Sequence, residues 1–338
     1  MDKCYSFDEI CLIPKAQSKI NSKKDTNPFI DGKLPIFVAP MTCIIDKKNW
    51  GTFLNSRVIP IYPVWYNETP DFSHGWVAVT LKTFKEYFVE QSKNLDPDDE
   101  YNVLIDCAQG QMESLYEMTS EAKKTFKNLK VMIGNIANPG SYVECCKHGV
   151  DFVRIGIGGG SGCTTAVETG FHTSIPWMLY KINFYRNLPY VKEKIYSGEY
   201  TETKVIADGG INTVAKFIKS LALGADYVMM GKMFSQCVEA CGEIKTEFDK
   251  DSNSIDKRHY YGQSSIYGQM DRFGKIKSLP EGTDLWVPIT SDLSITERTL
   301  EERLRSAMSY AGAFTLNDFI GKVDYEIQTI SEFNSYNK

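Results

Sequence analysis

The stretch RIGIGGGSGCTT, at 154–165, carries the residue type best suited to covalent chemistry. Five glycines surround one cysteine, Cys163, which two threonines follow. Most cysteines are small buried hydrophobes, but no apolar periodicity here predicts burial of Cys163. A reactive thiol needs backbone donors or positive charge nearby, and no histidine or lysine is adjacent in the sequence. Three interpretations stay open: a flexible linker, a phosphate cradle, and a loop that presents a nucleophile.

Two other segments have the residue types of an anion-binding site. The first, ADGGINT, contains Asp208, Gly209 and Gly210, and the second, MMGKMFSQ, contains Gly231 and Lys232. Glycines between a strand and a helix let backbone N–H groups approach a phosphate. A carboxylate would repel a phosphate, so Asp208 is better suited to the vicinal hydroxyls of a ribose. The alternative is that these glycines only form tight turns.

Short apolar runs rich in β-branched and aromatic residues predict eight strands that are buried on both faces. These runs lie at 34–40, 57–63, 76–81, 101–108, 130–137, 151–158, 204–210 and 226–231. Amphipathic segments, predicted to be helical, lie at 112–129, at 212–224 with Asn212 as N-cap and Gly224 as stop, and at 300–320. This alternation predicts a (β/α)8 TIM barrel, with an open doubly wound sheet as the alternative.

Polar residues gather just after the C-terminal ends of the predicted strands, where barrel enzymes build their sites. Asp106 ends the fourth strand, Asn135 the fifth and Asp208 the seventh. The connections after the sixth and eighth strands are longer than a barrel needs, and long loops at this face are usually lids or binding loops. We therefore expect all 338 residues to form a single domain, with a catalytic loop at 158–173 and a long mobile flap at 242–292.

Composition narrows the class of protein. The chain has a net charge of −5 and a pI near 5.6, whereas nucleic-acid and membrane-surface binding require a basic face; we expect neither partner. Acidic residues interrupt the apolar start of the chain, which argues against a signal peptide. Nine scattered cysteines without a CxxC motif indicate reduced thiols in a cytoplasm. The four histidines do not pair with cysteines at zinc-site spacing.

Several segments, in one order along nearly the whole chain, resemble the IMP dehydrogenase / GMP reductase family. They are SFDEICLIPKAQS, LPIFVAPMTCIID, LIDCAQG, VMIGNIANP, VRIGIGGGSGCTT, VIADGGINTVAKFIKSLALGADYVMMG, YYGQSS and LPEG. The resemblance implies a (β/α)8 barrel, in agreement with the strand pattern. It also implies hydride transfer between C2 of a purine nucleotide and a nicotinamide cofactor.

The resemblance assigns roles to individual residues. Cys163 matches the cysteine that attacks C2 to give a covalent adduct, which splits a difficult substitution into two steps. Thr165 and Glu281 match a pair that manages protons on the departing or attacking group. For the substrate, the resemblance implies that the 5′-phosphate is bound by Ser161, Gly210, Gly231 and Tyr261, the ribose by Asp208, and the rest of the nucleotide by Gly209, Lys232, Gly262 and Gln263. For the cofactor, it implies Asp106 and Asn135. A monovalent cation such as K+ would be bound by the carbonyls of Gly158, Gly160 and Cys163.

Two features favour the reductase activity over the dehydrogenase activity. The chain has no room for the regulatory insert that many dehydrogenases carry, and YYGQSS is closer to the reductase pattern. Against this, Arg272 and Phe273 resemble the dehydrogenase's Arg-Tyr pair without its hydroxyl, although an isolated arginine in a polar loop is more often a solvated surface charge. The activity that the resemblance implies is NADPH-dependent reductive deamination at C2, GMP to IMP plus ammonia, and the resemblance also implies a homotetramer. The alternatives are an IMP dehydrogenase without the insert, which would use NAD to give XMP, and a non-catalytic purine-nucleotide-binding barrel.

Some positions depart from the family pattern. Gly159 stands where the family has proline, Ala166 where it has arginine, and Gln263 where it has the methionine that abuts the purine. Glutamine exchanges an apolar contact for a donor and an acceptor. These departures suggest a modified or deoxy purine nucleotide as substrate. A divergent GMP reductase with compensated changes is the alternative.

Overall fold

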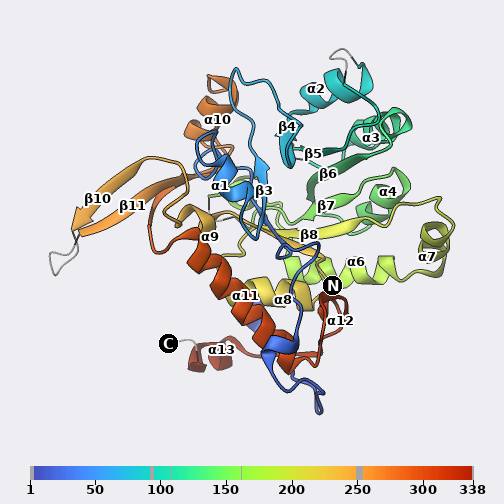
Figure 1. Ribbon diagram of the computed structural model, residues 1–338, viewed down its shortest axis with the longest axis vertical. Helices are drawn as coiled ribbons and strands as arrows, with labels where there is room; N and C mark the ends of the chain where they lie inside the picture. Colours follow the sequence, from blue (N-terminus) through green and yellow to red (C-terminus); the bar gives the residue numbers. More distant parts are fainter. Residues whose placement is uncertain (1–3, 92–94, 108, 161, 249–253, 337–338) are drawn as a thin grey trace.

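The computed structural model describes residues 4–91, 95–107, 109–160, 162–248 and 254–336. Eight parallel strands close into a barrel, in which each strand pairs with the next and β9 pairs back onto β2 (Figure 1). The barrel strands are β2 (Ile36–Val38), β3 (Ile59–Tyr62), β4 (Trp76–Val79), β5 (Tyr101–Ile105), β6 (Leu129–Ile136), β7 (Phe152–Ile155), β8 (Lys204–Asp208) and β9 (Tyr227–Met230). The predicted TIM barrel is confirmed, and the open sheet is excluded.

Aromatic side chains fill the barrel near the N-terminal ends of its strands. Phe37, Trp76, Phe152 and Tyr227 pack edge-on or tilted, with ring centroids 5.1 to 5.9 Å apart. Edge-to-face packing of this kind is favourable beyond the apolar area that it buries. This layer closes one end of the barrel, so the functional cavity lies at the opposite rim.

Helices follow the strands and cover the outside of the barrel (Figure 1). None of the described helices is long and apolar enough to span a membrane. The helical elements are η1 (Phe7–Glu9), η2 (Lys23–Asp25), α1 (Trp50–Leu54), α2 (Leu81–Phe84), which runs into η3 (Lys85–Val89), α3 (Glu113–Thr125), α4 (Ser141–Lys147), α5 (Thr165–Thr169), α6 (Ile175–Arg186), α7 (Pro189–Tyr196), α8 (Val214–Ala222), α9 (Lys232–Ser235), α10 (Ile266–Phe273), α11 (Leu293–Tyr310), α12 (Leu316–Phe319) and α13 (Ile330–Tyr336).

The start of α8 differs from the prediction by one residue. Thr213, not Asn212, is the N-cap, because its hydroxyl accepts a hydrogen bond from the Lys216 N–H at 3.2 Å. Gly224 follows the C-cap residue and has a φ of +110°, as expected for a helix stop. The correction matters for the site, since Asn212 is left free to line the cavity at the rim.

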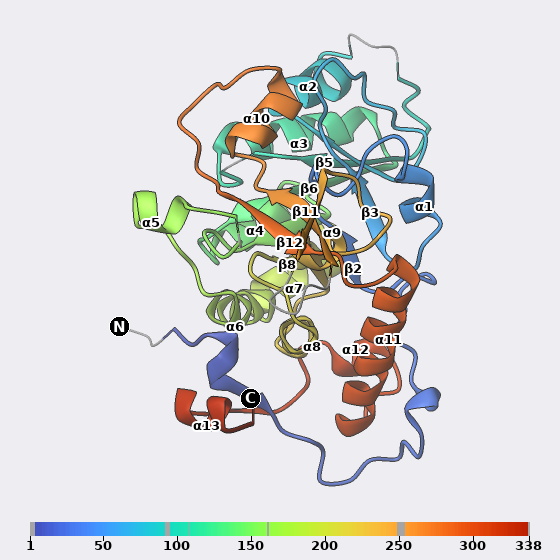
Figure 2. The same cartoon turned by 90° about the vertical axis from the view of Figure 1, so that its left-hand side faces the viewer.

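The segment 300–320, expected to be the last barrel-packing helix plus a short extension, contains the end of one helix and a second short helix. Helix α11 begins earlier, and it ends at Tyr310, shortly before Gly312 with a φ of +66°. A separate capping box at Thr315 starts α12. The chain then returns as β13 (Tyr325–Ile327), which pairs antiparallel with β1 (Ile10–Leu12) and brings the two terminal segments side by side (Figure 2).

The segment 242–292, predicted as a flap, folds into regular structure. Strands β10 (Ile244–Phe248), β11 (Ser254–Tyr261) and β12 (Asp284–Pro288) form an antiparallel sheet, whose β10–β11 hairpin projects from the barrel in Figure 1. Between β11 and β12 lies α10, and its Asp271 carbonyl accepts a hydrogen bond from the Tyr66 N–H at 2.6 Å. The flap is therefore anchored to the barrel rim; its mobility remains a prediction.

Candidate active site

A cavity at the C-terminal rim of the barrel brings together most of the residues that the sequence predicts. The predicted residues on its wall are Asp106, Gly160, Cys163, Thr165, Asp208, Gly209, Gly210, Gly231, Lys232, Gly262, Gln263 and Glu281. Tyr261, Asn135 and Gly158 are not on its wall, and Ser161 lies outside the described residues. The cavity is thus built from five barrel strands, the glycine-rich loop and the flap.

Three polar groups form a chain along one side of this cavity. The Cys163 Sγ lies 3.3 Å from the Thr165 Oγ1, which donates to the Glu281 Oε2 at 3.2 Å. The backbone fixes this arrangement: the Thr164 N–H donates to the Glu281 carbonyl at 3.1 Å, and Cys163 forms a β-bridge with Gly282. A thiol, a hydroxyl and a carboxylate in this order can move a proton between bulk solvent and an atom bound at the sulfur.

Exposure separates Cys163 from the other cysteines at the core of the barrel. Cys163 is exposed, whereas Cys43 and Cys237 are buried and Cys107 is largely covered. Burial raises the pKa of Cys43 to about 12 and the pKa values of Cys107 and Cys237 to about 11. Since the thiolate is the nucleophile, these three thiols are unsuited to attack at neutral pH.

Close backbone contacts explain why the catalytic loop is rich in glycine. A Cβ on Gly210, which has a φ of +72°, would lie 2.6 Å from the Gly159 carbonyl oxygen. A Cβ on Gly162 would lie 3.1 Å from the Thr283 carbonyl oxygen and 3.2 Å from the Gly262 nitrogen. At these two positions the loop, the turn after β8 and the flap approach so closely that a side chain has no room.

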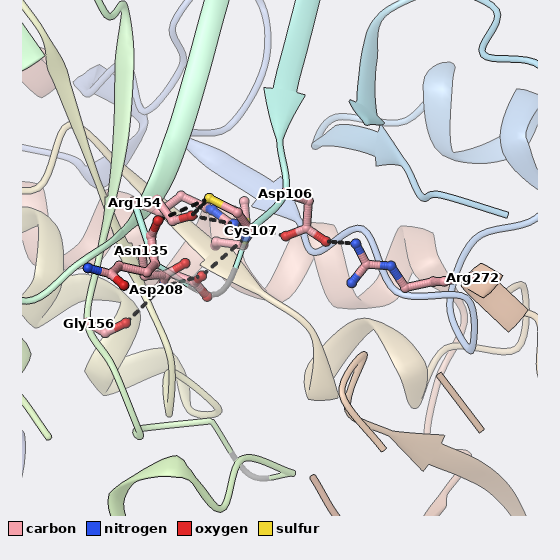
Figure 3. Close-up of polar contacts among 10 residues, drawn as sticks. Asp106, Cys107, Asn135, Arg154, Gly156, Asp208 and Arg272 are labelled. Carbon is pink, nitrogen blue, oxygen red and sulfur yellow. Dashed lines mark hydrogen bonds and ion pairs between the residues drawn. The ribbon is translucent and has the colours of Figure 1, made fainter. Parts of the chain in front are cut away.

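A buried charge network lies beneath the loop (Figure 3). From β7, Arg154 donates to the Asp106 Oδ1 at 3.0 Å, and its Nη1 lies 3.7 Å from the Asp208 Oδ2. Asn135 donates through its Nδ2 to the Asp208 Oδ2 at 2.9 Å and to the Gly156 carbonyl at 2.8 Å. The sequence analysis missed Arg154; the available signal was a charged residue inside an otherwise apolar strand.

The pKa values of the two carboxylates in this network, Asp106 and Asp208, are shifted in opposite directions. Burial acts to raise the pKa of Asp106, but Arg272 and Arg154 outweigh burial and hold that pKa below its usual value. Burial raises the pKa of Asp208 above its usual value, against the opposing effects of Arg154 and Asn135. Two cations face Asp106 whereas one faces Asp208 at a longer distance, which accounts for the difference.

Arg272 corrects an expectation of the sequence analysis. As an isolated arginine in a polar loop it was expected to be solvated, but its side chain is only 11% exposed and its Nη2 lies 3.0 Å from the Asp106 Oδ2 (Figure 3). Helix α10 brings it there. The Phe273 ring lies near two cations: the Lys277 Nζ is 3.6 Å and the Arg272 Cζ 5.3 Å from its centroid.

Tyr260, rather than Tyr261, lines the cavity. Successive residues of a strand point to opposite faces, and the Tyr261 hydroxyl donates to the Asp271 Oδ2 at 2.6 Å on the far side. The Tyr260 hydroxyl lies 3.2 Å from the position of a Cβ on Gly231, beside the predicted phosphate turn. The sequence alone offered two adjacent tyrosines, and only the register of β11 selects between them.

The Gly160 carbonyl, one of the predicted ligands of a monovalent cation, is already engaged in one hydrogen bond. The Gly160 carbonyl accepts a hydrogen bond from the Cys163 N–H at 3.0 Å, which leaves one lone pair for a cation. Across the described part of the chain, no group of three or more His, Cys, Asp or Glu side chains is arranged to hold a metal ion. A cation here would therefore be held by carbonyls, which suits a hard monovalent ion.

Fold and site together define a class: a (β/α)8 barrel with glycine turns after its last two strands and an exposed thiol facing them. The family model described as IMP dehydrogenase / GMP reductase domain matches residues 74–335. The chain belongs to this family of enzymes.

Individual relatives align over nearly their whole length. A GMP reductase of Bacillus subtilis (strain 168) is 31% identical, with 99% of each chain covered. A GMP reductase of Helicobacter pylori (strain ATCC 700392 / 26695) is 32% identical, and one of Ligilactobacillus salivarius (strain UCC118) is 29% identical, each with 98% of both chains covered. At these identities, substitutions at the site are to be interpreted residue by residue.

Proposed function

We propose that the protein reductively deaminates GMP, or a closely related purine nucleotide, at C2, giving IMP and ammonia from GMP. The observation that carries this proposal is the Cys163–Thr165–Glu281 chain on the wall of a cavity that also holds the glycine turns. The names of the aligned relatives support the same activity. A protein that only bound nucleotides would have no use for a thiol, a hydroxyl and a carboxylate in series.

The nucleotide would lie across the cavity from the turns to the thiol. Gly210, Gly231 and Lys232, together with Ser161, would hold the 5′-phosphate, and the position of Tyr260 adds a hydroxyl there. Asp208 would accept from the ribose hydroxyls. This placement puts the base over Cys163.

The chain's own residues would then carry out bond making and proton transfer. The Cys163 sulfur attacks C2, and the C2–N bond breaks as the amine leaves as ammonia. The thiol proton passes through Thr165 to Glu281 as the sulfur attacks, and Thr165 then returns a proton from Glu281 to the leaving nitrogen, which removes the cost of expelling an amide anion. When bound, a reduced nicotinamide cofactor, NADPH by resemblance with NADH as the alternative, would provide the hydride that C2 accepts. The sulfur departs as IMP forms.

Asp106 and Asn135 are the residues proposed to hold the cofactor; Asn135 lies off the cavity wall and its Nδ2 already donates to Asp208 and Gly156, so Asp106 is the better placed of the two. Both oxygens of Asp106 are taken by guanidinium groups, from Arg154 and from Arg272. Each carboxylate oxygen keeps a second lone pair, so a ribose hydroxyl would share Asp106 with these guanidinium groups. Arg154 is fixed within the barrel, whereas Arg272 comes from the flap, so Arg272 is the group that a ribose hydroxyl would compete with and displace.

One observation favours a second activity, the oxidation of IMP to XMP with NAD. Arg272 contacts Asp106 of the cavity wall, where a cation could assist a water molecule. Its neighbour Phe273 has no hydroxyl to share in that step. The reductase activity therefore remains the proposal, and the assay described below also measures the dehydrogenase activity.

The resemblance also leads us to propose a homotetramer in the cytoplasm and a K+ ion on the carbonyls of Gly158, Gly160 and Cys163. Light scattering after size exclusion measures the first. For the ion, turnover in K+ against Na+ and against a bulky organic cation is the measurement, and equal rates in all three would exclude a role.

An absorbance assay of the nicotinamide tests the activity. GMP, IMP and their deoxy forms are each combined with NADPH, NADH, NADP+ and NAD+. We expect oxidation of NADPH with GMP, together with release of ammonia. If oxidised cofactor is consumed with IMP instead, the direction is wrong, and if no combination reacts while GMP binds, the non-catalytic alternative holds.

A further inference from the structure

Gln263 carries a polar side chain that the protein itself leaves unused. Its Nε2 and Oε1 are both buried, and neither has a hydrogen-bond partner among the described residues. A buried amide without partners costs free energy, so native proteins rarely keep one without a role. The other buried side-chain atoms that lack a partner in the described part of the chain are single donor or hydroxyl groups, at Arg154 on the same cavity wall, at Arg272 and at four residues elsewhere. Among the described residues, Gln263 is the one side chain whose buried donor and acceptor are both without a partner, as a ligand-binding amide would be.

Backbone hydrogen bonds of its two neighbours, Gly262 and Ser264, hold the chain on either side of Gln263. On one side, the Gly262 N–H donates to the Thr283 carbonyl at 3.4 Å, and the Thr283 N–H donates to the Gly162 carbonyl at 3.0 Å. On the other side, the Ser264 carbonyl accepts from the Glu281 N–H at 3.2 Å. The first contact leads to the loop that carries Cys163, and the second leads to Glu281, whose carbonyl accepts from the Thr164 N–H of that loop. Gln263 lies between them and lines the same cavity.

The proposed position of the nucleotide determines which edge of the base Gln263 meets. With C2 at the Cys163 sulfur and the sugar and phosphate toward Asp208 and Gly210, N3 faces the sugar side. The N1–C6 edge then extends beyond C2, away from the phosphate turns and toward the flap segment that contains Gln263. This step rests on the proposed function.

The N1–C6 edge exists in two complementary forms. A 6-oxopurine such as GMP offers an N1–H donor and an O6 acceptor, whereas a 6-aminopurine offers an N1 acceptor and an amino donor. A glutamine amide satisfies either form after a half-turn about its last side-chain torsion, which is a soft one. A site whose hydrogen-bonding groups cannot rotate discriminates against a substrate with the mismatched edge by a factor of about 10⁴–10⁵ in kcat/KM. No hydrogen bond within the described residues fixes the amide of Gln263.

We propose that Gln263 reads the N1–C6 edge in both orientations, and that the protein therefore removes the 2-amino group of a 2,6-diaminopurine nucleotide as well as that of GMP. The C2–N bond breaks and a C2–H bond forms. The reduced nicotinamide cofactor is oxidised by two electrons, and with two protons the amine leaves as ammonium. The product is the adenine nucleotide. The 6-amino group is not touched, because the attacking sulfur is at C2.

The test compares GMP with 2,6-diaminopurine ribonucleoside 5′-monophosphate as substrates of the full chain, with product identified by chromatography. We expect kcat/KM values within about tenfold of each other, because one amide serves both edges. Gln263→Met should lower both by about tenfold or more, since it removes a donor and an acceptor together. Gln17→Met, on the exposed N-terminal segment, is the matched control and should change neither.

Binding to Cys163→Ala, measured by calorimetry, separates recognition from chemistry. Comparable affinities for the two nucleotides, both reduced when Gln263→Met is added, would support the proposal. If GMP is turned over but the diaminopurine nucleotide binds more than a thousandfold more weakly, the dual recognition is wrong and the proposed function stands. If Gln263→Met changes neither affinity, Gln263 does not read the base. If GMP binds but is never turned over, the proposed function itself fails.

Discussion

Arg272, on α10, and Asp106, after β5, form a nearly buried ion pair with an Nη2–Oδ2 distance of 3.0 Å, although 166 positions separate them in the chain. The side chains are 11% and 14% exposed. Arg154 holds the other oxygen of Asp106 from inside the barrel. The flap is thus connected to the carboxylate that is proposed to bind the cofactor. Cofactor binding at Asp106 and the position of the flap should therefore affect each other.

Arg272→Ala should lower the KM for the reduced nicotinamide cofactor. The variant frees one oxygen of Asp106, and a charge-assisted hydrogen bond contributes about 1.5–3 kcal/mol, so a decrease of roughly tenfold is expected. Steady-state kinetics at saturating GMP measure it. Arg303→Ala, exposed on α11, is the control. An unchanged or higher KM would show that Arg272 and the cofactor do not compete.

Cys163→Ala should abolish turnover while nucleotide binding persists. Removal of a covalent nucleophile typically costs a factor of about 10³ or more in kcat. The control is Cys4→Ser, which changes an exposed thiol outside the cavity with Cys163 and should keep full activity. Residual turnover near the wild-type rate would exclude the covalent mechanism.

Tyr260→Phe should raise the KM for the nucleotide by roughly tenfold, through loss of one hydrogen bond to a charged phosphate. Tyr261→Phe, a change of the same size one residue along, removes only the contact to Asp271. Its nucleotide KM should stay close to that of the wild type, with a lower stability of the flap. The reverse pattern would place Tyr261, as the sequence predicted, at the phosphate.

Gly210→Ala should destabilise the protein and weaken nucleotide binding. Its Cβ would meet the Gly159 carbonyl at 2.6 Å, in addition to the strain of a φ of +72°. Gly198→Ala is the matched control, since it has a φ of +76° with no atom within 4 Å. We expect a loss of about 1 kcal/mol for the control from backbone strain alone, and about 2–4 kcal/mol for Gly210→Ala. Urea unfolding measures both, and equal losses would mean that the loop adjusts freely.

The stability that Asp106 contributes should disappear in acid. Its pKa is lowered in the folded protein, so as the pH falls the unfolded chain takes up the proton first, near pH 3.9. The ionised carboxylate therefore stabilises the fold above that pH, and the contribution is lost as the pH falls through the folded pKa. The difference in unfolding free energy between wild type and Asp106→Asn should shrink from about pH 7 to about pH 3. Glu332→Gln, exposed on α13, should show no such change, and a constant difference for Asp106→Asn would refute the shifted pKa.

The sequence by itself determined the barrel and the location of its site. Runs such as 101–108 and 204–210 are apolar on both faces, and strands of that kind require helices on the outside. Because parallel strands end at one rim, Asp106 and Asp208 had to face a common cavity. The glycine pattern around Cys163 identified the loop, since no other residue tolerates such close backbone contacts.

Only the tertiary structure decided the rest of the site. Whether Arg272 is solvated or buried depends on Asp106, a residue far away in the chain, so no local pattern could predict it. The choice between Tyr260 and Tyr261 depends on the register of β11 against β12, because a shift of one residue exchanges the two faces of a strand. The strands themselves follow from local burial patterns, whereas these two features depend on long-range pairing, which becomes fixed only when the flap packs onto the rim.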